Sequence, residues 1–131
     1  MITRELIDEL HELSLKAYGG GSGTRDEGML ESAIARPFQT FGGEPLYPTV
    51  YEKAAAIAQS VIVNHPYIDG NKRTGLLAII AMLEVYGFEL TAESNETYEM
   101  TIKISTGNIE LNEISDWIEH NSRLIKTNAS E

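Results

Sequence analysis

Ten consecutive residues near the middle of the chain carry side chains that could together transfer a phosphate-containing group. They span residues 65–74 and read His-Pro-Tyr-Ile-Asp-Gly-Asn-Lys-Arg-Thr. His65 is the natural general base, because an imidazole titrates near neutral pH. Pro66 disfavours helical backbone angles at the residue before it, so we expect His65 on an extended loop that precedes a helix. Asp69 could be the N-cap of that helix or hold Mg²⁺ through its oxygens.

The second half of this segment is suited to binding an anion. Gly70 allows a ligand close to the backbone, and Asn71 can donate a hydrogen bond. Lys72 offers a compact charge and Arg73 a planar fork, which are two ways of holding phosphate oxygens. Residues 75–86 are apolar on nearly every side and predict a buried helix, whose N-terminal N–H groups would face the same ligand. These residue types together indicate phosphoryl or nucleotidyl transfer.

Residues 65–74 resemble the signature of the Fic/Doc family, His-Pro-Phe-x-(Asp/Glu)-Gly-Asn-(Gly or Lys)-Arg. The first half is similar to the Fic form, with Tyr67 in place of phenylalanine, and the second half is similar to the death-on-curing (Doc) branch. Lys72 replaces the second motif glycine of AMP-transferring Fic enzymes, and Leu76 stands where those enzymes carry a second arginine. In the Doc branch these changes accompany ATP bound in the reversed sense. The resemblance therefore implies kinase chemistry in preference to AMP transfer.

The resemblance implies a Doc-type toxin of a toxin–antitoxin system, in which ATP and Mg²⁺ are used to modify a Ser or Thr hydroxyl of a protein. The implied target is a threonine of elongation factor Tu. In this scheme His65 removes the acceptor proton and Asp69 holds the metal. The phosphates are held by Gly70, Asn71, Lys72 and Arg73.

The same resemblance implies that the activity is restrained by a partner. Many Fic proteins block their own site with a helix that carries Ser/Thr-x-x-x-Glu-(Gly/Asn), and this sequence lacks that pattern. Restraint would then come in trans, from a Phd-like antitoxin segment that folds into a groove.

Two other functions stay open at this point. One is AMP transfer to a protein, if the Fic-like half of the motif dominates. The other is a non-catalytic binding or regulatory module that has kept the fold. A lone His-Pro followed by Asp-Gly is often only a turn and a helix start, and we favour a site because eight positions match at fixed spacing.

Composition indicates one cytoplasmic domain. The chain has 131 residues, no cysteine and a formal net charge of −10. This length suits a single core, so we expect one domain over residues 1–131, with residues 126–131 as a frayed tail. Without cysteine there is no disulfide or thiolate metal site, and an acidic surface disfavours direct binding of nucleic acid. We find no signal peptide and no apolar run long enough for a membrane span.

The spacing of apolar residues predicts an all-α domain of about six helices around the buried helix 75–86. Start and stop signals place the other helices from Thr3 to the glycines at 19–23, from Asp26 to Pro37, from the capping box at Thr49 to Asn64, from Ser94 or Asn95 to Gly107, and from Asn112 or Ser115 onward. Leu13, Ala17, Tyr98, Thr101, Ile102 and Trp117 are expected to face the core. His11 is expected at the surface or at the boundary of the core, and His120 at the surface.

The connection between the first two predicted helices is rich in glycine. Residues 19–23 read Gly-Gly-Gly-Ser-Gly and predict a flexible link. Arg25 and Asp26 follow it, and we expect an ordinary helix cap and salt bridge there, with the rim of the site as the alternative.

Residues 38–48 predict a hairpin, because Gly42-Gly43 separates two segments that contain aromatic residues. By resemblance this hairpin is the family's flap, which aligns the backbone of the target beside the active loop by adding a strand. The alternative is a plain surface loop with Phe38 and Phe41 tucked into the core.

Overall fold

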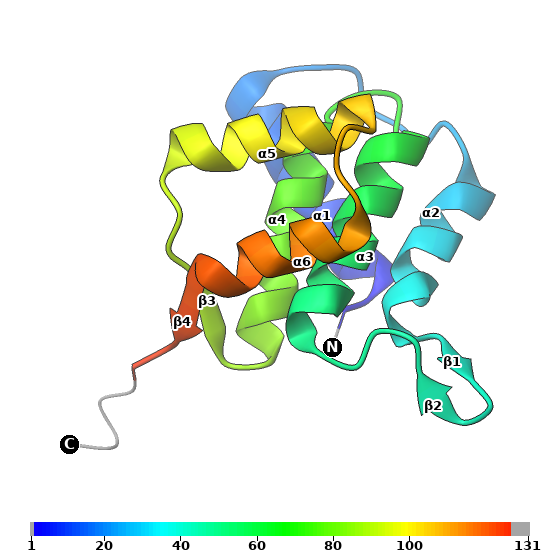
Figure 1. Cartoon of the computed structure of the whole chain (residues 1–131). Helices are drawn as coiled ribbons and strands as arrows, with labels where there is room; N and C mark the ends of the chain where they lie inside the picture. The colour runs from blue at the N-terminus through cyan, green and yellow to red at the C-terminus, as the bar shows by residue number, and fades with distance from the viewer. Residues whose placement is uncertain (1, 127–131) are drawn as a thin grey trace.

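The protein folds as six α-helices with two short pairs of strands, as the computed structural model of residues 2–126 describes it (Figure 1). This confirms the all-α class. In chain order the elements are α1 (Arg4–Tyr18), α2 (Glu27–Ala35), the 3₁₀ helix η1 (Arg36–Phe38), β1 (Thr40–Phe41), β2 (Glu44–Pro45), α3 (Val50–Asn64), α4 (Asn71–Val85), β3 (Phe88–Leu90), α5 (Ser94–Thr106), α6 (Leu111–His120) and β4 (Ser122–Leu124).

Three of the helices begin at the capping residues that the sequence indicates. The side chain of Thr3 accepts a hydrogen bond from the N–H of Leu6 at the start of α1. Asp26 accepts one from the N–H of Met29 at the start of α2. Thr49 and Glu52 form the expected capping box of α3. Such caps satisfy N–H groups that have no partner inside the helix.

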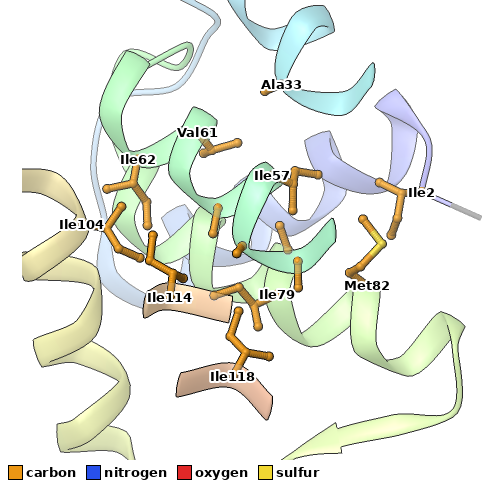
Figure 2. Packing of buried hydrophobic residues seen from close by; sticks show 14 of the residues in the cluster. Ile2, Ala33, Ile57, Val61, Ile62, Ile79, Met82, Ile104, Ile114 and Ile118 are labelled. Atoms are coloured by element: carbon orange, nitrogen blue, oxygen red, sulfur yellow. The ribbon is translucent and has the colours of Figure 1, made fainter. Parts of the chain in front are cut away.

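Helix α3 lies at the centre, and α2, α4, α5 and α6 all pack on it. Residues 54–58 of α3 read Ala-Ala-Ala-Ile-Ala, and all five are buried. Small side chains on several sides of a helix let its neighbours approach closely. Figure 2 shows the resulting core, in which side chains of α3 meet those of the surrounding helices. Helix α3 contributes Ile57, Val61 and Ile62, and the other helices contribute Ile79, Met82, Ile104, Ile114 and Ile118.

The buried central helix is therefore α3, and our expectation for residues 75–86 was wrong in this respect. Helix α4 buries one face, which includes Ile79 and Met82. Leu76 and Leu77, on another side, are only half-buried and line an open groove. The apolar character of α4 on nearly every side thus reflects a core face and a groove face together.

The predicted hairpin is present as β1 and β2, which pair antiparallel with Phe41 opposite Glu44. Gly42 and Gly43 form its turn with φ angles of 58° and 85°, a left-handed region that glycine adopts without strain. Phe41 is 79% exposed at the tip and Phe38 is 44% exposed, so neither is tucked into the core.

Several apolar residues lie outside the core that we expected to hold them. Leu13 and Tyr98 are exposed, as are Ala17 and Ile102. The buried face of α5 is made by Thr97, Met100, Thr101 and Ile104, and of these only Thr101 was expected to face inward. Trp117 is partly buried and packs against the core, as expected. His120 is exposed, also as expected.

The antiparallel pair β3–β4 was not expected from the sequence. It joins Phe88–Leu90 to Ser122–Leu124 and ties the end of α4 to the end of α6. Most of the predicted tail, residues 127–131, lies outside the described residues. Over the described part of the chain, every helix is too short or too polar to cross a membrane.

Candidate functional site

The loop 65–70 joins the end of α3 to the start of α4, so the candidate base and the candidate anion site belong to adjacent helix ends. His65 is exposed and is the C-cap of α3. Its φ and ψ are 49° and 59°, in the left-handed region, where the sequence had indicated extended backbone. A residue other than glycine in this conformation costs about 1–2 kcal/mol, and the surrounding contacts must supply it.

The start of α4 has no side-chain cap. Gly70 is its N-cap, with φ 77°, and no side chain of residues 2–126 accepts from the first turn. Within the same residues, the backbone N–H groups of Asn71, Lys72 and Arg73 have no protein acceptor, because the first helical bond runs from the Thr74 N–H to the Gly70 carbonyl. These N–H groups and the helix dipole are suited to binding an anion.

Asp69 lies beside this helix end but does not cap it, so that part of our expectation is replaced by Gly70. One Asp69 oxygen accepts from the Gly70 N–H at 2.9 Å, and the other accepts from the Gly21 N–H at 3.2 Å. The residue is otherwise exposed. Mg²⁺ at nucleotide sites is commonly held by one or two carboxylates together with phosphate oxygens, and Asp69 fits that donor set. In the described part of the chain no three acidic, His or Cys side chains form a metal site by themselves.

The Asn71 side chain is committed to the loop. Its Oδ1 accepts from the Tyr67 N–H at 3.0 Å, and its Nδ2 donates to the Tyr67 carbonyl at 3.0 Å. Both groups are buried. The contribution of Asn71 to an anion site would therefore come from its backbone N–H and not from its side chain, which holds the loop in shape.

The two cations differ in their surroundings. Lys72 is half-exposed. Arg73 is exposed, and its guanidinium lies over the ring of Tyr18, 3.8 Å from the ring centroid, in a cation–π contact. Arg73 and Tyr18 both line an open groove of about 680 Å³ between α1, α4 and α5, which also includes Leu13 and Tyr98. The exposed apolar residues of α1 and α5 thus gather next to one of the candidate phosphate ligands.

His11 is a site residue that the sequence analysis missed. We expected it at the surface or at the boundary of the core, but it is 2% exposed. Its Nε2 donates to the Asp69 carbonyl at 2.8 Å, and its ring stacks on the Tyr67 ring. A signal was available, because His11 shares the helical face of Ile7 and Ser14, which are also buried.

Tyr67 connects this stack to a charged network on α1. Its hydroxyl donates to Asp8 at 2.7 Å, and burial, followed by this contact, raises the pKa of Tyr67 above its ordinary value. Arg4 contacts Asp8 at 3.0 Å and Glu27 at 2.7 Å. The bond to Glu27 raises the pKa of Arg4, and the same bond lowers the pKa of the Glu27 carboxyl. The motif loop is thereby tied to α1 and α2.

The glycine-rich segment 19–23 is packed against the motif loop, although we expected a flexible link. The Gly23 carbonyl accepts from the Ile68 N–H at 3.1 Å, in addition to the contact of Gly21 with Asp69. A Cβ at Gly20 would stand 2.9 Å from an Asp69 oxygen. Glycine is therefore required at position 20 for the two segments to approach each other.

Comparison with known proteins now adds to this geometry. Residues 1–83 match the model of the Fic/DOC family. A protein of Mycolicibacterium smegmatis named Toxin Doc is 37% identical over 101 residues, which cover 76% of this chain and 78% of that protein. This chain belongs to the Fic/DOC family. A protein of Escherichia phage P1 named Protein kinase doc is 28% identical over 115 residues, 88% of this chain and 90% of the phage protein. Among Fic/DOC proteins, these relatives support the Doc branch.

Proposed function

We propose that this Fic/DOC protein is a cytoplasmic toxin that transfers the γ-phosphate of ATP to a Ser or Thr hydroxyl of a protein, with elongation factor Tu as the implied target. The observation that carries the proposal is the uncapped start of α4, where three backbone N–H groups lack acceptors among residues 2–126, next to the segment from His65 to Arg73. The name of the Mycolicibacterium smegmatis relative supports a toxin, and the name of the phage relative supports a kinase.

On the acceptor side, the chain supplies a base. His65 is exposed at the end of α3, where a hydroxyl of another protein can reach its imidazole. In the proposed reaction one ring nitrogen takes the proton of that hydroxyl as its oxygen attacks the γ-phosphorus of ATP. The bond between that phosphorus and the oxygen bridging to the β-phosphate breaks, and ADP leaves with the bridging oxygen. A base in this role contributes about 10²–10⁴-fold to the rate.

On the phosphate side, the chain supplies hydrogen-bond donors and positive charge. The N–H groups of Asn71, Lys72 and Arg73 and the two cationic side chains are arranged around the start of α4. They would hold the phosphate oxygens and stabilise the negative charge of the transition state. Mg²⁺, held by Asp69 and by the phosphates themselves, would neutralise further charge on the transferred group.

Lys72 and Leu76 favour phosphate transfer over AMP transfer. Lys72 occupies the position where AMP-transferring Fic enzymes have a glycine. Leu76 occupies the position where they have an arginine, whose guanidinium would bind the phosphates. The experiment is to incubate the protein with Mg²⁺, the candidate target and ATP labelled at either the α or the γ phosphate. The proposal predicts label on the target from the γ position alone, and label from the α position alone would establish AMP transfer in its place.

The binding-module alternative is tested by His65→Asn, because asparagine tolerates left-handed backbone but is not a base. We expect this variant to lose both phosphate transfer and growth arrest while it folds normally. Full growth arrest without transfer would mean that the protein acts by association.

The groove between α1, α4 and α5 supports the proposed restraint by a Phd-like antitoxin. Its apolar lining includes Leu13, Leu77 and Tyr98, and Arg73 also lines it. An amphipathic segment could bury apolar side chains there and pair an acidic one with Arg73. A partner bound in this way would occupy a cation that the proposed reaction needs.

A further inference from the structure

Arg25 makes three contacts with the backbone that carries His65. Its Nη2 donates to the Asn64 carbonyl and its Nε to the His65 carbonyl, both at 2.6 Å. Its backbone N–H donates to the Pro66 carbonyl at 2.7 Å. One residue from the segment before α2 therefore binds three consecutive carbonyls at the end of α3.

The Asn64 and His65 carbonyls come at the end of α3, and the last carbonyls of a helix have no partner inside that helix. Pro66, the residue that follows them, has no N–H and donates no hydrogen bond at this helix end. The planar fork of an arginine supplies two parallel donors to neighbouring oxygens, and its charge is favourable at the negative end of a helix dipole.

The segment that carries Arg25 is itself fixed to the motif loop. Thr24 and Tyr67 form an antiparallel bridge, and the Asp26 N–H also donates to the Pro66 carbonyl, at 3.0 Å. The backbone of residues 24–26 is therefore fixed to Pro66 and Tyr67, while the Arg25 guanidinium contacts the end of α3.

We propose that Arg25 is a positioning residue for His65: its guanidinium holds the backbone of His65 in the left-handed conformation that directs the imidazole. This role goes beyond the helix cap and salt bridge that the sequence predicts, because the acceptors of the Arg25 guanidinium are the Asn64 and His65 carbonyls. The inference rests on the proposed function only where activity is the readout. The conformation of His65 can be measured independently.

The test compares Arg25→Lys with Arg36→Lys as a matched control. Arg36 also binds α3, through the Ala56 carbonyl and the Ser60 hydroxyl, but these acceptors lie roughly one and a half to two and a half helical turns before His65. Lysine keeps the charge at either position and cannot bridge two acceptors with a planar fork. Arg25→Ala serves as the stronger variant, and Arg25→Lys carries the test if that protein does not fold.

The first readout is the set of His65 ¹³Cα and ¹³Cβ chemical shifts, which report its backbone angles whether or not the protein is an enzyme. We expect these shifts to move in Arg25→Lys and to stay unchanged in Arg36→Lys. Unchanged His65 shifts in both Arg25 variants would overturn the proposal, even if the melting temperature fell.

The second readout is the rate of γ-phosphate transfer. Misplacement of the base predicts that Arg25→Lys lowers kcat about tenfold while KM for ATP stays within twofold, and that Arg36→Lys changes neither. A rise in KM with unchanged kcat would overturn the proposal, because Arg25 would then act on the nucleotide. If the wild-type protein transfers no phosphate at all, the proposed kinase function fails, and the His65 shifts still decide the role of Arg25.

Discussion

The imidazole of His11 lies flat against the ring of Tyr67, with the ring centroids 3.7 Å apart and an angle of 7° between the planes. His11 also binds the carbonyl of Asp69, a residue 58 positions later in the chain. The stack and this hydrogen bond fix the loop on one side, and the bond from Tyr67 to Asp8 fixes it on another. Helix α1 therefore determines the shape of the loop that presents Asp69.

Replacing His11 by phenylalanine tests this support. The variant keeps a ring for the stack but leaves the Asp69 carbonyl without its donor, which should lower the free energy of unfolding by about 1 kcal/mol. We also expect weaker binding of Mg²⁺-ATP, because the backbone of Asp69 loses its hydrogen bond to α1. Urea unfolding and calorimetry measure the two effects. His120→Phe is the control, since His120 is exposed on α6, and equal affinity in the His11 variant and the wild type would refute the coupling.

The raised pKa of Tyr67 predicts that the folded protein loses stability at alkaline pH. The folded state raises the pKa of Tyr67, so the unfolded chain ionises first, near pH 10. The corresponding stabilisation is complete below pH 10 and is lost as the pH rises above it, by up to about 1.4 kcal/mol per pH unit. Tyr67→Phe should cost about 1 kcal/mol at pH 8, through the bond to Asp8, and should be less sensitive to alkali. In urea unfolding, the difference in free energy of unfolding between Tyr67→Phe and wild type should be smaller at pH 11 than at pH 8. An equal difference at the two pH values would contradict this prediction.

The two hydrogen bonds of the Asn71 side chain predict that its removal destabilises the folded protein strongly, although Asn71 lies inside the motif. Asn71→Ala leaves the Tyr67 N–H and carbonyl without their side-chain partners, and we expect a loss of about 2–4 kcal/mol from two such groups. Asn108→Ala is the control, because its amide binds only an exposed threonine hydroxyl. Thermal or urea unfolding separates the two variants. A similar small effect for both would show that the Asn71 side chain is available for a ligand after all.

Gly75 lies at the contact between α3 and α4. A Cβ there would lie 2.5 and 2.8 Å from two carbons of Ile62, so Gly75→Ala should destabilise the protein by about 1–3 kcal/mol. Gly28 in α2 has no such contact, its nearest neighbour being an Asp26 oxygen at 3.5 Å. Gly28→Ala should instead stabilise by up to about 1 kcal/mol, as helix propensity dictates. Opposite signs in urea unfolding are expected, and equal effects would contradict the close packing of α3 on α4.

Local signals in the sequence were sufficient for most of the helices. Caps at Thr3, Asp26 and Thr49 act within one helical turn, and the turn at Gly42-Gly43 is a property of two adjacent residues. The burial of His11 could not be read with the same certainty, because it depends on Tyr67 and Asp69 far along the chain. The pairing of β3 with β4 is also a long-range contact between strands of only three residues each.

The sequence also overestimated burial on two helices. Leu13 and Tyr98 have the spacing of core residues, yet they are exposed along the groove. An apolar face reads the same whether it packs on the protein itself or is left open for a partner. For the same reason we expected α4 at the centre of the domain. The centre is occupied by the alanine-rich α3, because small side chains give a weak hydrophobic pattern in the sequence but permit close packing.

The most direct test of the account is a titration of the ¹⁵N-labelled protein with Mg²⁺-ATP, followed by the amide resonances of residues 2–126. The account predicts that the largest shifts fall on Asn71, Lys72 and Arg73, whose N–H groups lack acceptors in the described chain, with Gly70 beside them. Removing Mg²⁺ should weaken the binding. Shifts that leave these amides unchanged and gather elsewhere, for example along the groove between α1 and α5, would contradict the claim that a triphosphate binds at the start of α4.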